Sequence, residues 1–216
     1  MKFRAFVLKS AYLGKGLRVL TVYGEKVGSH SLIVKVPKEE FPLKYEPFSL
    51  TFFSVKELGE KREVVGARLI RSHFPSSVAQ FKYRFKLTGL LVGKQLPWEE
   101  RLFKLLESYL PITSDFKLAY LMFLLKFTYI EGLYPVLNRC VVCGSFSFNA
   151  FSLKEGGVVC ERCASGGELP WSYRDSKLAL RLTKLPFKEA KGLHLPGEGY
   201  RRLVSAFEKH LAQRTQ

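Results

Sequence analysis

The chain has few of the residues that catalytic sites use. It contains only two aspartates, Asp115 and Asp175, and both stand where helix caps are expected. Two-metal nucleases need clustered carboxylates, whereas Glu39-Glu40 and Glu99-Glu100 look like loop and helix-start charges. The scarcity of acidic clusters argues against metal-dependent hydrolysis.

The four histidines, His30, His73, His194 and His210, are also scattered, without the spacing of a metal site or a base. A GxxxxGK[ST] phosphate loop is absent from the sequence, so nothing indicates ATP hydrolysis. A nucleophile beside a base is a spatial arrangement that sequence does not reveal. From the missing carboxylate clusters, histidine spacing and phosphate loop, we predict a protein that is not an enzyme.

A long apolar run is missing too. The most apolar stretch, residues 118–130, is interrupted by Lys126 and flanked by Lys117 and Glu131. It is shorter than the roughly 20 apolar residues of a membrane span, so we expect a central buried helix. The opening MKFRAFVLKS alternates like a strand and lacks the apolar core of a signal peptide. These features predict a soluble cytoplasmic protein with no membrane partner.

The chain carries an excess of positive charge, with 35 Lys and Arg against 19 Asp and Glu, or +16. The excess is spread along the sequence, so a disordered polybasic arm does not explain it. Hydrophobic residues make up 47% of the chain, which argues against disorder. A folded electropositive surface follows, for which nucleic acid is the first candidate partner and an anionic membrane surface the second.

All four cysteines lie in two C-x-x-C pairs, Cys140 with Cys143 and Cys160 with Cys163. The spacing C-x2-C-x16-C-x2-C is typical of a zinc site. Each pair can direct two thiolates at one ion, and zinc accepts four sulfurs in a tetrahedron. Because protein would supply all four ligands, the pattern predicts one structural Zn²⁺ with no open position for catalysis.

Other uses of the four thiols stay open. Two disulfides would need an oxidising compartment. A redox C-x-x-C is usually a single motif, not a matched pair. Other metals are the remaining alternative, and the structural zinc site is the favoured interpretation.

The first 73 residues read as β-structure. Short runs rich in Val, Leu, Phe and Tyr alternate with turn residues, which suggests a small five-stranded barrel of the OB type, with an SH3-like barrel as the close alternative. The runs are FRAFVL, LRVLTVY, SLIVKV, FSLTFFSV and EVVGARLI.

The periodicity then becomes helical, and a short cysteine-bearing segment with a hairpin turn at residues 155–157 interrupts the helices. Ser76 or Ser77 can cap a helix through residue 93, and Asp175 or Ser176 can start a later one. Pro97 suits the first turn of a helix over residues 98–110.

We predict an α+β multidomain protein from this order of elements. An N-terminal five-stranded OB-fold β-barrel is followed by an α-helical bundle with an inserted four-cysteine zinc module. The predicted parts are the OB-fold domain at residues 1–73, the helical domain at 74–137 and 173–216, and the zinc module at 138–172.

The cysteine region is the most specific part of the sequence. Residues 133–164, LYPVLNRCVVCGSFSFNAFSLKEGGVVCERCA, resemble the stretch GYxPxLxxC-xx-CG…GGxxC-xxC of bacterial RecO recombination-repair proteins. Residues 3–28 are similar to the opening strand, loop and second strand of that family, except that Lys15 replaces an acidic residue of the first loop. Glu46-Pro47-Phe48 resembles the Pro-Phe strand start of the family.

The resemblance implies an OB-fold, a helical domain and an inserted zinc module. It further implies binding to single- and double-stranded DNA, annealing of complementary strands, and loading of recombinase onto DNA coated by single-strand-binding protein. The implied partners are RecR and the acidic C-terminal tail of the single-strand-binding protein. Some family members lack the zinc ligands, which implies a structural metal.

Basic and aromatic residues interleave in the predicted barrel and just beyond it. Cations neutralise phosphates, and rings stack on bases regardless of sequence. Any single surface Lys or Arg is more often only solvated, and most of the aromatics should face the core. The candidate DNA-binding residues are Lys9, Lys15, Arg18, Lys35, Arg68, Arg71, Lys82, Arg84 and Lys86, with Tyr12, Tyr23, Phe52, Phe53, Tyr83 and Phe85 between them.

Arg201 and Arg202, on the last amphipathic segment, are candidates for binding an acidic partner peptide, although an exposed helix face explains them equally well. The leading hypothesis is a non-enzymatic DNA-annealing protein of recombinational repair. The alternatives are a zinc-stabilised RNA- or ribosome-binding module and a zinc enzyme acting on nucleic acid.

Overall fold

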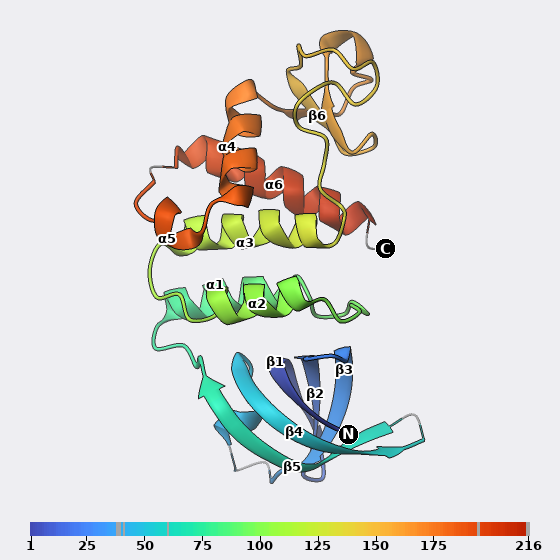
Figure 1. The fold of residues 1–216 in the computed structure, drawn as a ribbon, viewed down its shortest axis with the longest axis vertical. Helices are drawn as coiled ribbons and strands as arrows, with labels where there is room; N and C mark the ends of the chain where they lie inside the picture. The colour runs from blue at the N-terminus through green and yellow to red at the C-terminus, as the bar shows by residue number, and fades with distance from the viewer. Residues whose placement is uncertain (38–39, 41, 60, 194, 215–216) are drawn as a thin grey trace. The chain divides into compact units, whose positions relative to one another are not determined.

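The computed structural model describes residues 1–37, 40, 42–59, 61–193 and 195–214. The chain forms two compact units, Met1–Phe116 and Lys117–Gln216. The first unit contains the barrel and two helices, and the second contains the remaining helices and the cysteine segment (Figure 1). The predicted division into four parts stays a prediction.

Five strands close into a barrel in the order β1-β2-β3-β5-β4. All neighbouring strands are antiparallel except β3 and β5, which run parallel through Ile33 and Glu63. The prediction of a five-stranded OB-type barrel is confirmed. The strands are β1 (Lys2–Gly14), β2 (Leu17–Gly24), β3 (Gly28–Lys35), β4 (Ser49–Leu58) and β5 (Lys61–Ser72), with a 3-10 turn η1 (Leu43–Tyr45) before β4.

The barrel interior is filled by alternate side chains of its strands, as the two-residue period requires. The buried cluster is Phe3, Ala5, Val7, Leu20, Val22, Leu32, Val34, Val36, Tyr45, Phe53 and Val55. Phe6 points out of the barrel, yet it is fully buried, because its ring packs against that of Phe103 on α2 (Glu100–Tyr109). The two ring centroids are 5.0 Å apart. A helix therefore covers the outer face of β1.

Helix α1 (Val78–Gly89) begins at the N-cap Ser77, whose side chain accepts a hydrogen bond from Gln80 N. It ends four residues before the predicted boundary, because residues 90–93 form a turn. The prediction that Pro97 lies in the first turn of a helix is wrong, since α2 begins at Glu100. Pro97 instead lies in the linker, where its carbonyl accepts a 3.0 Å hydrogen bond from the Tyr23 hydroxyl.

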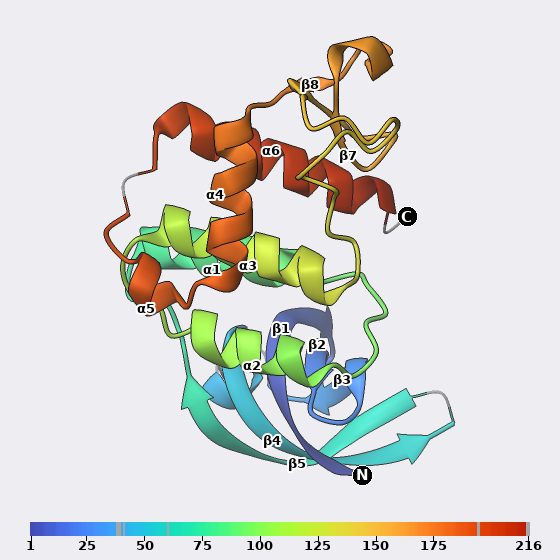
Figure 2. The same ribbon diagram turned by 45° about the horizontal axis from the view of Figure 1, so that its top comes forward.

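The second unit is built on α3 (Phe116–Ile130), which is buried along most of its length, as its apolar sequence predicted. Figure 2 shows α4 (Tyr173–Lys184) and α6 (Gly197–Arg214) near it, with the short α5 (Phe187–Ala190) following α4. Lys126, the charge inside the apolar run, donates a 2.6 Å hydrogen bond to Thr183 O. Within the described ranges, no helix combines the length and apolar composition needed to cross a bilayer.

Helix α4 starts with a capping box. The Ser172 side chain accepts from Asp175 N, and the Asp175 carboxylate accepts from Ser172 N. The helix therefore begins two residues earlier than predicted, with Asp175 inside its first turn. Arg202 of α6 binds the same carboxylate at 3.2 Å, so this cap also ties α4 to α6.

Gly28 opens β3 where the backbone passes very close to the linker before α2. Its φ is +76°, and a Cβ there would lie 2.5 Å from Leu96 O and 2.9 Å from Pro97 C. Ser29 N donates a 2.9 Å hydrogen bond to Leu96 O beside it. Only glycine fits both the positive φ and the close approach.

We expect Gly28→Ala to lower the free energy of unfolding of the first unit by at least about 2 kcal/mol, since it adds a left-handed strain and a backbone clash. Gly66→Ala is the matched control, because a Cβ at Gly66 would lie 3.6 Å from the nearest atom, an ordinary contact. Chemical denaturation of both variants measures the difference. Equal stability of the two would contradict this account of the linker.

Candidate metal centre and nucleic-acid interface

The cysteine segment contains a small sheet, and Figure 1 shows it beside the first turn of α4. Its three strands lie in the order β7-β6-β8. They are β6 (Ala150–Ser152), β7 (Gly157–Val159) and β8 (Leu169–Pro170), with a 3-10 turn η2 (Glu161–Cys163) between the last two. The predicted hairpin is present as β6 and β7. We call residues 138–172 the cysteine module.

The two glycines at the start of β7, Gly156 just before it and Gly157 as its first residue, serve different needs. Gly156 takes a positive φ of 77° in the hairpin turn. Gly157 lies against the chain that enters the module, where a Cβ would meet Val136 O at 2.6 Å. Val158 N donates a 2.9 Å hydrogen bond to the same carbonyl. The glycine pair thus joins the hairpin to the end of the preceding segment.

Each C-x-x-C pair forms a tight turn. Gly144 N donates to Cys140 O at 2.9 Å, and Cys163 N donates to Cys160 O at 3.0 Å. These turns bring both cysteines of a pair to one side. Cys140 and Cys160 are buried, whereas Cys143 is exposed.

The four sulfurs converge. All the ligand atoms lie within 4.8 Å of one another, and the sulfurs of Cys143 and Cys160 are 3.7 Å apart. A tetrahedron with metal–sulfur bonds of about 2.3 Å has sulfur–sulfur edges of about 3.8 Å. A disulfide would require about 2.05 Å. The arrangement therefore fits one four-coordinate metal ion, and the cysteines are free thiols.

The thiols also show why a cation belongs at this point. Burial opposes ionisation of Cys140, but backbone N–H groups around its sulfur outweigh that effect and lower the pKa of Cys140 to about 6. Hydrogen bonds to Cys160 and Cys143 raise the pKa of Cys163 to about 12. Four thiolates can coexist at these distances only around a positive ion.

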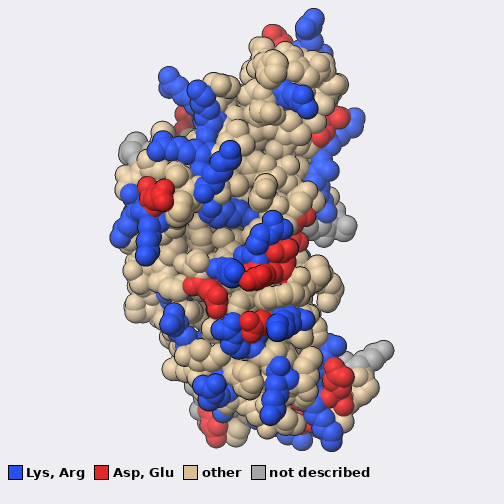
Figure 3. Space-filling model, in the orientation of Figure 1, with Lys and Arg blue, Asp and Glu red and all other residues tan. Residues whose placement is uncertain are grey.

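Positive side chains are distributed widely, and Figure 3 shows Lys and Arg scattered across the visible face with fewer acidic side chains among them. Five of the barrel candidates are exposed: Lys9, Lys15, Lys35, Arg68 and Arg71. Lys35 of β3 stands opposite Leu17 of β2 in the sheet, and Lys15 lies in the turn just before Leu17. The two lysines are therefore near each other. The Arg68 guanidinium lies 5.9 Å from the centre of the Phe52 ring.

Arg18 differs from these residues because it is only 6% exposed. Its guanidinium pairs with Glu46 at 2.9 Å and donates to Glu40 O at 3.3 Å. We correct the prediction here: Arg18 is a buried structural cation that holds the segment before β4 against β2. It is withdrawn from the candidate DNA contacts.

Helix α1 divides its basic residues between two faces. Lys82 and Lys86 are exposed, one turn apart. Arg84 is 3% exposed and donates to Leu110 O at 2.9 Å and to His73 O at 2.6 Å. Arg84 is likewise withdrawn, because its hydrogen bonds connect α1 to the ends of β5 and α2.

The aromatics divide in the same way. Tyr23 and Phe53 are fully buried and Tyr83 nearly so, as the core interpretation expected. Phe85 and Tyr12 are exposed among the candidate rings, and Phe85 stacks on the exposed Phe81 at 5.8 Å between ring centroids.

An apolar stripe on α1 was not singled out from the sequence. Val78, Phe81 and Phe85 of α1 are all exposed, and their spacing places them on one helical face. Phe74, in the segment before the helix, is exposed as well. Lys82 and Lys86 follow the two rings directly in the sequence. The helical spacing of these three apolar residues, with cations beside two of them, was the signal that could have revealed this surface.

Arg201 and Arg202 have different environments on α6. Arg202 binds Asp175 and, at 2.7 Å, Glu198, so its charge is already satisfied. Arg201 is exposed and lines a pocket of about 300 Å³ in the second unit. The other lining residues are Lys117, Leu195, Gly197 and Tyr200.

The side chains that could bind a metal gather at one place. In the part of the chain that the structure describes, the four cysteines are the one cluster of three or more metal-binding side chains. Burial, with Arg84 and Arg71 nearby, lowers the pKa of His73 to about 4, so this side chain is neutral at pH 7. His194 and Glu39 lie outside the described residues.

The architecture is thus that of a basic protein with a closed OB-type barrel, a helical unit and a cluster of four cysteines that could hold a metal ion. Residues 98–216 match the family model "Recombination protein O C terminal". This match covers more than half of the chain, and the chain belongs to the RecO family.

Curated relatives agree with this assignment. The chain is 28% identical over 183 residues to "DNA repair protein RecO" of Alkaliphilus metalliredigens, covering 76% of this chain and 72% of that protein. It is 25% identical over 175 residues to the protein of the same name from Oceanobacillus iheyensis, covering 76% and 67%. The protein of that name from Thermoanaerobacter sp. gives 25% over 175 residues, covering 76% and 71%.

We expect the purified chain to contain one tightly bound metal ion, with zinc as the metal. Cys160→Ser should lose the ion and lower the free energy of unfolding by at least about 2 kcal/mol, because ligand binding supplies folding energy to so small a module. Elemental analysis and thermal unfolding measure the two effects.

Val142→Ser is the matched control, since it places the same side chain at an exposed position of the first knuckle. It should retain the metal and change stability by no more than about 0.5 kcal/mol. If the wild-type chain is as stable without the metal as with it, a structural metal is ruled out.

Proposed function

We propose that this chain is a DNA-binding recombination mediator of DNA repair. It would anneal complementary strands and, with RecR, help to load recombinase onto DNA coated by single-strand-binding protein. The match of residues 98–216 to the RecO family model carries the proposal, and the relatives are named DNA repair proteins. A DNA repair protein acts where the DNA lies, and we therefore propose a cytoplasmic location.

The proposed DNA surface of the first unit combines cations and exposed rings. On the barrel it includes Lys9, Lys15, Lys35, Arg68 and Arg71, all of which reach solvent. On α1 it includes Lys82 and Lys86 with the stacked pair Phe81 and Phe85. Cations release counterions from the phosphates, and exposed rings stack on unpaired bases without reading sequence.

This mechanism needs no catalytic group. Two negatively charged strands repel each other, and a cationic surface lowers that repulsion enough for complementary bases to meet. The net charge of +16 makes such screening strong at low salt. The metal, which we propose is Zn²⁺, would hold the cysteine module through Cys140, Cys143, Cys160 and Cys163 and leave no ligand position for substrate.

The pocket beside Arg201 is the proposed site for the acidic tail of the single-strand-binding protein. Arg201 and Lys117 supply two cations, while Leu195 and Tyr200 supply apolar surface. A short acidic peptide with an apolar residue needs both kinds of contact. Arg202 would act indirectly, by fixing α6 against the Asp175 cap.

We expect single-stranded DNA affinity to fall steeply with salt, and Lys82→Gln/Lys86→Gln to make the log–log slope shallower by about 1.4, or about 0.7 for each lost phosphate contact. Fluorescence anisotropy with labelled oligonucleotides at several salt concentrations gives the slope. Arg101→Gln/Lys104→Gln is the control, because these exposed cations of α2 are paired with Glu99 and Glu100.

The function itself is tested by annealing of complementary oligonucleotides coated with single-strand-binding protein, with and without the chain. Acceleration supports the mediator function, and no acceleration contradicts it. Competition with structured RNA separates the RNA-binding alternative, which predicts that RNA displaces DNA at lower concentration. A salt-independent affinity would contradict the electrostatic mechanism.

For the partner pocket, we expect Arg201→Glu to weaken binding of a peptide with the sequence of the acidic tail by about tenfold or more, since a favourable charge contact becomes a repulsive one. Isothermal titration with the peptide measures this. Lys209→Glu, an exposed charge reversal on the same helix, should leave the affinity within about twofold. Equal losses in both variants would show only a general charge effect.

A further inference from the structure

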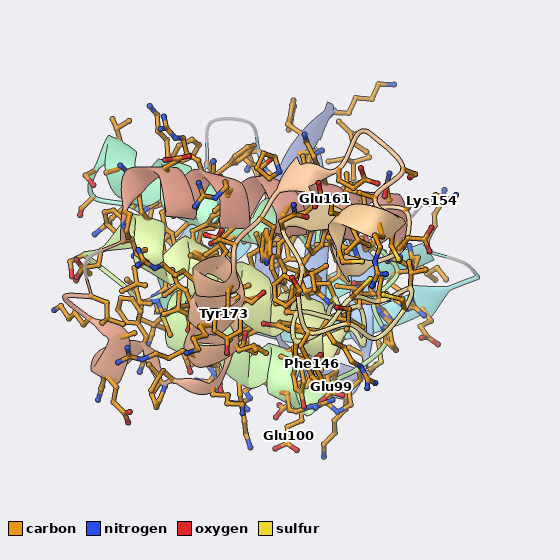
Figure 4. The ribbon with its side chains drawn as sticks, turned by 90° about the horizontal axis from the view of Figure 1, so that it is seen from above. Glu99, Glu100, Phe146, Lys154, Glu161 and Tyr173 are labelled. Atoms are coloured by element: carbon orange, nitrogen blue, oxygen red, sulfur yellow. The ribbon has the colours of Figure 1, made fainter. Side chains whose placement is uncertain are left out.

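A second groove, of about 500 Å³, lies in the second unit where the cysteine module meets α4. The module contributes Phe146 and α4 contributes Tyr173, both labelled in Figure 4. The remaining lining residues are Leu137, Asn138, Ser176, Lys177 and Leu180. Neither the metal centre nor the pocket beside Arg201 shares a residue with this groove.

The groove exposes large rings to solvent. Phe146 is 80% exposed and Tyr173 is 59% exposed. Such rings commonly mark a binding surface when they lie together with other apolar side chains, and Leu180 of the same groove is also exposed. The ring of Phe148 packs against that of Tyr173, with 6.2 Å between the ring centroids, and holds the Tyr173 ring in place.

The turn at Cys140–Cys143, which we call the first knuckle, fixes the start of the loop that carries Phe146. Cys140 N donates to Ser145 O at 2.7 Å, directly before this residue. Ser147 N donates to Ser145 Oγ at 3.2 Å, directly after it. The knuckle therefore presents Phe146 on an ordered turn even though its ring makes few contacts.

The charged side chains that line the groove or lie exposed on α4 are all cations. Lys177 Nζ lies 4.8 Å from the centre of the Tyr173 ring. Arg174, Arg181 and Lys184 are exposed on the same helix. The acidic residue of α4, Asp175, is buried in its contacts with Ser172 and Arg202. Among the lining residues there is no carboxylate.

Exposed rings, an apolar floor and surrounding cations match the chemistry of a single strand of nucleic acid. Rings stack on unpaired bases and cations contact the phosphates that connect them. Bases paired inside a duplex are not available for such stacking. We propose that this groove is a second binding site for single-stranded DNA, with bases stacked on Phe146 and Tyr173 and a phosphate near Lys177.

The inference rests on the proposed function and extends it. A strand held here and a strand on the first unit would both be bound to one chain, which raises their effective concentration for each other. The site would thus act in annealing, and duplex DNA would not need it.

The test uses the full-length chain and a short oligo-dT that carries 5-iodouracil. Ultraviolet crosslinking followed by peptide mapping should give adducts on the peptides that contain Phe146 or Tyr173. Phe146→Ala should abolish the adduct at that loop, weaken oligo-dT binding at this site about fivefold or more, and slow annealing, with duplex affinity unchanged. Phe146→Tyr should restore binding, because it keeps the stacking face.

Val142→Ala is the control, as it truncates another exposed apolar side chain of the same knuckle that does not line the groove. Adducts confined to the first unit, or equal annealing by Phe146→Ala and Val142→Ala, would overturn the site. Loss of acidic-peptide binding in Phe146→Ala with unchanged oligo-dT binding would assign the groove to a protein partner instead. If the wild-type chain binds no single-stranded DNA, the proposed function fails before any variant is compared.

Discussion

The convergence of four cysteine sulfurs is the constraint on which the cysteine module depends. The module has three short strands and a small buried cluster of Cys140, Val159 and Cys160. Phe151 and Trp171 are buried as well, but three strands of two or three residues leave most of residues 138–172 in loops, whose ordering costs conformational entropy. A cation shared by four thiolates would supply further stabilisation and would fix both loops at once.

Buried arginines have a comparable role in the first unit. Arg18 and Arg84 each keep a guanidinium away from bulk water and direct it at carboxylate or carbonyl oxygens. Burying such a charge is costly unless its hydrogen bonds are made. Both residues therefore specify how loops meet the barrel and α1, and a part of the large positive charge is structural.

Much of the architecture could be predicted from the sequence because it rests on local patterns. Alternation identified the five barrel strands, and the cysteine spacing identified the metal-binding module. Interactions between distant segments could not be predicted in this way. Arg18 and Arg84 look like surface cations in the sequence, yet Glu46 and Leu110 O bind them in the fold. The cysteine spacing likewise says nothing of Phe146, whose ring is exposed on the loop after the first cysteine pair.

The contact between Gly28 and the Leu96–Trp98 backbone has a practical consequence for dividing the protein. Tyr23 strengthens this contact between the barrel and the linker, because its hydroxyl donates to Pro97 O and accepts from Glu99 N. A fragment cut after β5 would leave this phenol and the Phe6 ring facing water. An autonomous N-terminal piece should therefore extend to Phe116, and its strands and two helices should exchange their amide hydrogens as one cooperative body.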